Sequence, residues 1–157
     1  MSASEADYPE ILQLAGRYAF AIDYNEPEAW ADCFTSDGSF ESNIQGRFTG
    51  RDDLVYFCET VSAYCESQGM KPRHWNNQWV IDLDGDRATS KCYAVIIDAG
   101  KNSSISSIGH YQDVLIKDKG QWLFKERVYH FDGEIDPSLS DAMKELFKDK
   151  PLSLIHI

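Results

Sequence analysis

Four strand-like segments follow one another between Arg73 and Phe131, in the stretch RHWNNQWVIDLDGDRATSKCYAVIIDAGKNSSISSIGHYQDVLIKDKGQWLFKERVYHF. Each segment is long and rich in β-branched and aromatic residues, which favour strands. The segments are Arg73–Leu83, Arg87–Asp98, Ser104–Lys117 and Gln121–Phe131, and the turns between them are Asp84-Gly85-Asp86, Gly100-Lys101-Asn102 and Asp118-Lys119-Gly120. Successive strands joined by tight turns predict an antiparallel meander, and this meander decides the fold.

The segment Cys92–Asp98 is apolar at both of its alternating positions. Tyr93, Val95 and Ile97 share one face, and Cys92, Ala94 and Ile96 share the other. A sheet that is apolar on both faces has to be covered twice. Helices cover only one face, so the pattern predicts a homo-oligomer with a subunit interface on the other face. Ordinary irregularity of a strand near an edge is the alternative explanation.

The segment before residue 70 has helical periodicity. Ile11, Leu14, Tyr18 and Ile22 have the spacing of a helix over about Tyr8–Ile22. A second helix is predicted from an N-cap at Asn25 to its end at Phe34. Two short strands follow, Ser39–Ser42 and Gly46–Thr49, around a turn at Asn43-Ile44. Further helices are predicted after Gly50 and over Ser140–Phe147. Helices followed by a long sheet predict an α+β fold.

Length and charge exclude several classes of protein. With 157 residues, 43% of them hydrophobic, the chain is expected to form a single domain over residues 1–157. Its 15 basic and 26 acidic residues give a net charge of −11, which disfavours nucleic-acid partners. No apolar run approaches the roughly 20 residues of a membrane helix. Met1–Tyr8 lacks the features of a signal peptide. A cytoplasmic protein with no membrane partner is expected.

Asp23 and His74 are the first candidates for chemistry. Asp23 ends an apolar helix face at the negative end of the helix dipole, where the charge of a carboxylate is electrostatically unfavourable. A carboxylate in such a place is a candidate for a functional role. A solvated Asp at a helix end is the alternative. His74 begins the first long strand, where strict alternation places Asn76 and Gln78 beside it and Trp75 and Trp79 on the packed face. An Asp that orients a His is the usual arrangement of a general base.

Several short motifs resemble the SnoaL-like family of the nuclear transport factor 2 superfamily. They are Tyr18-Ala19-Phe20-Ala21-Ile22-Asp23, Cys33-Phe34-Thr35-Ser36-Asp37-Gly38, His74, Asp84-Gly85-Asp86-Arg87-Ala88, Gly109-His110-Tyr111-Gln112-Asp113, and Gly120-Gln121-Trp122 with Arg127. The resemblance implies a cone-shaped α+β barrel, in which a curved antiparallel sheet wraps around N-terminal helices and a central pocket. It also implies an Asp23–His74 base dyad, as in scytalone dehydratase, bile-acid 7α-dehydratase and hexachlorocyclohexane dehydrochlorinase, and favours a trimer over a dimer.

Other residues are candidates for supporting roles in such a pocket. Tyr18, His110 and Arg127 are candidate catalytic groups, because each offers a donor or a cation for a developing negative charge. The candidate substrate-binding residues are Asn76, Trp30, Phe34, Phe57, Tyr93 and Tyr129; the aromatic members are equally explained as core. No nucleotide-binding motif and no metal-ligand spacing is present, so no cofactor and no metal is expected.

The predicted function is a cofactor-independent lyase of the dehydratase type, acting on a small, largely apolar cyclic substrate. His74, oriented by Asp23, removes a proton from a carbon next to an activating group. An isomerase or cyclase needs the same residues without a leaving group and is the first alternative. A non-catalytic carrier of small ligands, or an accessory subunit like the β subunit of a dioxygenase, is the alternative outside enzymes.

Overall fold

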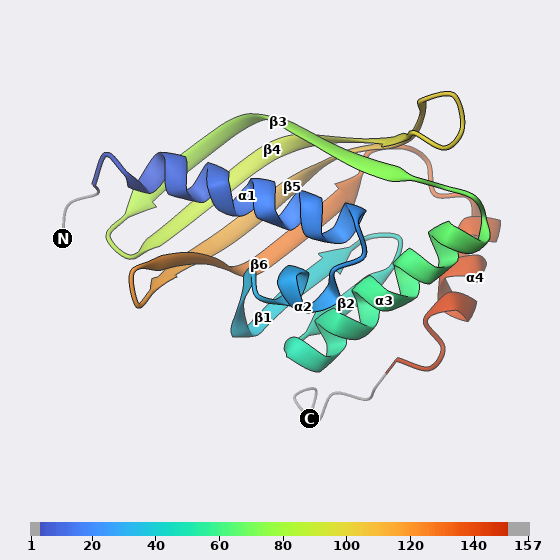
Figure 1. Ribbon diagram of the computed structural model, residues 1–157, viewed down its shortest axis with the longest axis horizontal. Helices are drawn as coiled ribbons and strands as arrows, with labels where there is room; N and C mark the ends of the chain where they lie inside the picture. The colour runs from blue at the N-terminus through green and yellow to red at the C-terminus, as the bar shows by residue number, and fades with distance from the viewer. Residues whose placement is uncertain (1–3, 151–157) are drawn as a thin grey trace.

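The computed structural model describes residues 4–150, which form four helices and six strands. The helices are α1 (Asp7–Asp23), α2 (Pro27–Ala31), α3 (Arg51–Ser67) and α4 (Pro137–Leu146). The strands are β1 (Phe34–Ser42), β2 (Gly46–Thr49), β3 (Pro72–Asp84), β4 (Arg87–Asp98), β5 (Ser104–Asp118) and β6 (Gln121–Phe131). Figure 1 shows α1 lying across one face of the curved sheet, with α4 beside the C-terminal part of α3. The α+β cone fold expected from the sequence is confirmed.

The six strands form one sheet in the order β2-β1-β6-β5-β4-β3. Strand β3 pairs with β4, β4 with β5 and β5 with β6, and all three pairs are antiparallel. This confirms the predicted meander. Strand β1, however, runs parallel to β6, so the expectation of a wholly antiparallel sheet is wrong at this pair. The two strands are far apart in the chain, and neither has a local pattern that specifies the direction of their pairing.

Strand β1 also begins earlier than expected. The second helix ends at Ala31 instead of Phe34, and Phe34 already pairs with Phe124 of β6. The polar residues Thr35-Ser36-Asp37-Gly38, which follow the predicted helix end, lie within the strand, where the pairing register shifts between Phe34 and Ser39. Gly38 permits this bulge, because a Cβ there would lie 2.9 Å from the Cβ of Phe34. The bulge keeps Phe34 in the core, where 4% of its surface is exposed.

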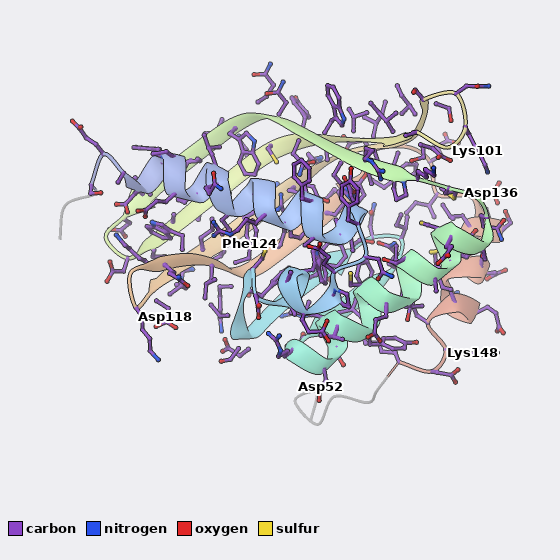
Figure 2. All side chains as sticks on the ribbon, viewed as in Figure 1. Asp52, Lys101, Asp118, Phe124, Asp136 and Lys148 are labelled. Atoms are coloured by element: carbon purple, nitrogen blue, oxygen red, sulfur yellow. The ribbon has the colours of Figure 1, made fainter. Side chains whose placement is uncertain are left out.

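The face of the sheet that packs against α1, here called the inner face, carries the core. Tyr18, Tyr111, Leu115 and Phe124 are among its buried residues. Figure 2 shows Phe124 in the middle of the molecule, whereas Asp52, Lys101, Asp118 and Lys148 lie at the periphery. The opposite face, here called the outer face, has no helix on it among the described elements and exposes Trp75, Tyr93 and Ile108.

A bulge in β3 changes which residues face the core. The pairing of β3 with β4 shifts between Asn77 and Val80, and Gln78 has a positive φ of 60°. The extra residue reverses the alternation, so Trp79 joins His74 on the inner face and packs against the core. Trp75 is 68% exposed on the outer face. The expectation that Trp75 and Trp79 share a packed face is therefore wrong.

Candidate active site

A cavity of about 610 Å³ lies at one end of the inner face. Helix α1 contributes its last turn, with Ile22 and Asp23, and the sheet contributes residues of β3, β4, β5 and β6. Helices α3 and α4 contribute a wall that is mostly apolar: Phe57, Val61, Cys65, Leu139, Met143 and Leu146. A cavity of this size and lining suits a small, largely apolar ligand.

Asp23 and His74 meet at the wall of this cavity. The Asp23 Oδ1 lies 2.6 Å from the His74 Nδ1, and the Asp23 Oδ2 accepts a hydrogen bond of 3.0 Å from the His74 backbone N–H. The two side chains are 7% and 11% exposed. These two contacts offset the cost of an anion at the negative end of α1. The contact predicted between Asp23 and His74 is present in the structure.

The contact with Asp23 determines which ring nitrogen of His74 is free to accept a proton. An ionised carboxylate only accepts hydrogen bonds, so Nδ1 of His74 carries a proton that it donates to Asp23. The lone pair is then on Nε2, and no group within residues 4–150 hydrogen-bonds that atom. The arrangement provides an oriented base whose reactive nitrogen is available to a ligand in the cavity.

Tyr18 lines the cavity, whereas Arg127 lies behind it in the core. Tyr18 is 2% exposed, and burial raises the pKa of its hydroxyl to about 12. The Arg127 guanidinium is fully buried below, 4.2 Å from the centre of the Tyr18 ring and 3.8 Å from that of Tyr111. Its Nε is 3.3 Å from the Asp113 Oδ1. Arg127 does not line the cavity, so the expectation of a cation in direct contact with the substrate is wrong.

Trp30, Phe34 and Asn76 have buried side chains that do not line the cavity. Trp30 is fully buried and Phe34 nearly so; they pack on each other with ring centres 5.1 Å apart. Neither lines the cavity, whereas Phe57, which stacks on Trp30, does. Asn76 lies two residues from His74 on the inner face, but its amide is buried and hydrogen-bonds no group within the described chain. These placements separate the core aromatics from the cavity wall.

Tyr93 and His110 lie on the outer face, away from the cavity. Tyr93 is 62% exposed, and it pairs in register with His110 of β5. The His110 Nδ1 is 2.8 Å from the Asp132 Oδ1, and its ring stacks on that of His130. The expectation that these two residues contribute to the pocket is wrong, because strand alternation places them opposite Tyr111 and Cys92.

Some cavity residues have no counterpart in the sequence-based set. Ser107 of β5 lines the cavity and is hydrogen-bonded to Tyr129 of β6, which was predicted to bind the substrate. Helix α4 contributes Leu139, Met143 and Leu146. A small polar residue two positions before Gly109, and so on the same face of the strand, was the available sequence signal that Ser107 could line the cavity. The apolar spacing of α4 did not indicate where the helix packs.

Comparison with known proteins identifies the family. The family model described as the SnoaL-like domain matches residues 4–128. The chain therefore belongs to the SnoaL-like family. Its fold is the one that solved structures described as cystatin-like share. No curated protein matches the chain.

Solved structures share this fold. A variant of Rv3472, a protein of unknown function from Mycobacterium tuberculosis, is 27% identical with a TM-score of 0.76, covering 92% of this chain and 89% of its own. A protein from Novosphingobium aromaticivorans is 19% identical with a TM-score of 0.73 and covers 88% of both chains. A protein from Catenulispora acidiphila, solved in complex with S-DNPA, is 23% identical with a TM-score of 0.71, covering 82% of this chain and 96% of its own.

Within residues 4–150, the helix lengths and the placement of possible metal ligands bear on partners and cofactors. None of the helices there is long and apolar enough to cross a membrane. No three His, Cys, Asp or Glu side chains of that segment gather as metal ligands would. Chemistry without a cofactor remains a prediction from the sequence.

Proposed function

We propose that the protein is a cofactor-independent lyase that eliminates water from a small, largely apolar ring compound. The observation that carries the proposal is the double contact of Asp23 with His74 at the wall of an apolar cavity. A protein that only carries a ligand needs the cavity but has no use for an oriented base, so the dyad favours catalysis.

The proposed reaction begins with proton transfer to His74. Nε2 takes a proton from the carbon next to a carbonyl group, and the electron pair of the C–H bond moves to form an enolate. The enolate then re-forms the carbonyl as its electrons expel a β-hydroxyl group, and the imidazolium returns its proton to that leaving group as water. Asp23 stabilises the imidazolium between the two steps. An isomerase would use the same first step and return the proton to another carbon.

The walls of the cavity support the class of substrate. The apolar side chains of α3 and α4 favour a ring system of low polarity, and the volume of about 610 Å³ accommodates two or three fused rings. The structural relative from Catenulispora acidiphila that was solved with S-DNPA supports a small molecule as the natural occupant of this fold.

Two bicyclic ketones test the two halves of the mechanism. In D2O, 1-tetralone exchanges the hydrogens next to its carbonyl, and 3-hydroxy-1-tetralone loses water to give 1-naphthol, which is fluorescent. We expect the protein to accelerate both reactions and His74→Ala to reduce both rates by about 10²–10⁴-fold. His110→Ala is the matched control, because His110 is on the outer face. Equal rates for the wild type and His74→Ala would exclude His74 as the base.

We further propose that a second copy of the chain covers the outer face. Trp75, Tyr93 and Ile108, which lie on three neighbouring strands, are 68%, 62% and 50% exposed. Trp75 pairs in register with Val95, and Val95 with Ile108, so the exposed apolar groups are contiguous. Contiguous apolar surface on a sheet without a covering helix is typical of a subunit interface.

A further inference from the structure

Two hydroxyl groups lie on the cavity wall, two and three strands away from His74. Ser107 of β5 and Tyr129 of β6 both line the cavity, and their hydroxyls are hydrogen-bonded to each other. The mechanism above needs a donor for the oxygen that becomes negatively charged. Of the donors predicted from the sequence, Arg127, Asn76 and His110 do not line the cavity, whereas Tyr18 does. The hydroxyl pair is a further candidate for this role.

The register of the sheet places the pair at a suitable distance from the base. His74 pairs with Ile96 of β4, and Ile96 pairs with Ser107, so the three residues form a row across the sheet. Neighbouring strands are about 4.8 Å apart, which puts the backbones of His74 and Ser107 about 10 Å apart. A base, an α-carbon with its carbonyl oxygen, and a hydrogen-bond donor together span about 8 Å. The backbone spacing of the row leaves room for one ketone group between the two side chains.

Tyr129 is held in place by its neighbours. A Cβ at position 109 would lie 2.7 Å from the Cε2 of Tyr129, so the glycine there leaves room for the ring against β5. The Tyr111 ring packs on the Tyr129 ring with centres 5.1 Å apart. Only 4% of the Tyr129 surface is exposed. A tyrosine with so little freedom presents its hydroxyl at a defined point, as a preorganised donor must.

The protonation of Tyr129 suits a hydrogen-bond donor. Burial raises the pKa of the Tyr129 hydroxyl above its ordinary value, and the charge of Asp132 acts in the same direction. Ser107 and Tyr129 thus have two hydroxyl hydrogens near neutral pH. One of these hydrogens is used within the pair, which leaves the other for an acceptor in the cavity.

Resting on the proposed function, we infer that the Ser107–Tyr129 pair binds the carbonyl oxygen of the substrate and stabilises its negative charge while His74 holds the proton. The substrate class is then a ring ketone, or a phenol that is its tautomer. Ser107 lies two strands away from His74 in the same row of the sheet, so the oxygen and the acidic C–H bond are recognised at separate places.

Binding of 2-naphthol and of 2-methylnaphthalene tests the subsite without any turnover. The two probes have the same shape, but only 2-naphthol has an oxygen. We expect the wild type to prefer 2-naphthol by about 3- to 10-fold, the usual contribution of one hydrogen bond. Tyr129→Phe and Ser107→Ala should each lose this preference and still bind 2-methylnaphthalene as the wild type does. Tyr8→Phe, which removes an exposed hydroxyl outside the cavity, is the matched control.

The outcomes separate this inference from the proposed function. A preference that survives in both Tyr129→Phe and Ser107→Ala, or that His74→Gln abolishes in their place, would overturn the inference. A wild type that prefers 2-naphthol but exchanges no hydrogens of 1-tetralone would contradict the proposed function and leave the oxygen subsite standing. If both hold, Tyr129→Phe should lower kcat for the exchange by about 10²-fold and change KM much less.

Discussion

At the scale of single residues, the carboxylate of Asp23 does two things for His74. One oxygen fixes the backbone of β3 at the start of the strand, and the other holds the Nδ1 proton of the ring. The first contact is structural, whereas the second sets the tautomer and stabilises the imidazolium. A change that keeps the shape of residue 23 but removes its charge can separate these two effects.

Asp23→Asn is that change. The amide oxygen can still accept from the backbone N–H of His74, so we expect the thermal stability to change little. The imidazolium loses its counter-ion, and the amide NH2 group can donate to Nδ1 and so place the lone pair on the wrong nitrogen. We expect the exchange rate of 1-tetralone in D2O to fall by about 10²–10⁴-fold, as measured by NMR. A rate within twofold of the wild type would contradict an orienting role for Asp23.

Asp53→Asn provides the matched control for that experiment. Asp53 is also a buried carboxylate, 4% exposed, and its Oδ2 accepts a hydrogen bond of 3.0 Å from the backbone N–H of Thr49. It lies at the beginning of α3 and does not line the cavity. A similar loss of activity in both variants would indicate a general effect of losing a buried charge.

At the scale of elements, Asp7 joins the beginning of α1 to the last two long strands. Its Oδ1 accepts hydrogen bonds of 3.0 Å from the Trp122 indole N–H and from the Lys117 ammonium. Its Oδ2 accepts one of 2.8 Å from the backbone N–H of Ser4. The Trp122 bond, followed by the Ser4 and Lys117 bonds, lowers the pKa of the Asp7 carboxyl to about 2.

This lowered pKa makes a prediction about stability and pH. Because the carboxyl is more acidic in the folded state, its stabilising effect is complete above the unfolded pKa of 3.8 and is lost as the pH falls towards about 2. We expect Asp7→Asn to unfold at a lower temperature than the wild type near neutral pH. The gap between their melting temperatures should close between pH 4 and pH 2. A gap that is constant over that range would show that the charge of Asp7 contributes nothing.

The sequence predicts correctly which side chains of a strand face the core only where the strand alternates without a bulge. The periodicity of α1 and the start of β3 made Asp23 and His74 candidates, and the resemblance to the family predicted that they form a pair. Trp75 and Trp79 were predicted on the wrong faces because β3 has a bulge at Gln78, which adopts a positive φ of 60°. A glycine at this position would have indicated the bulge, but the sequence has none there. Arg127 was predicted as a candidate catalytic group, but strand alternation gives the face of a side chain and not its depth. Its burial depends on Asp113, Tyr18 and Tyr111, which come from other elements.

At the scale of the whole molecule, non-local contacts were the hardest to foresee. The parallel pairing of β1 with β6 joins segments on opposite sides of the chain, and no turn between them sets their direction. Helix α4 closes the cavity because Phe147 stacks on Phe57, with ring centres 5.6 Å apart. The helix itself was expected, three residues later than it begins, but the place where it packs was not. Resemblance to the family predicted the cone shape, which local patterns alone leave open.

The outer face leads to the prediction about assembly. We expect sedimentation velocity at micromolar concentration to give two or three times the monomer mass of 17.9 kDa. Trp75→Glu should produce a monomer, because a carboxylate within the apolar surface would be buried at the interface without a partner. Phe20→Glu is the matched control: Phe20 is also 68% exposed, but it lies on α1 and should leave the mass unchanged. A wild type that sediments as a monomer, or a Trp75→Glu protein that keeps the oligomer mass, would show that the outer face is not the interface.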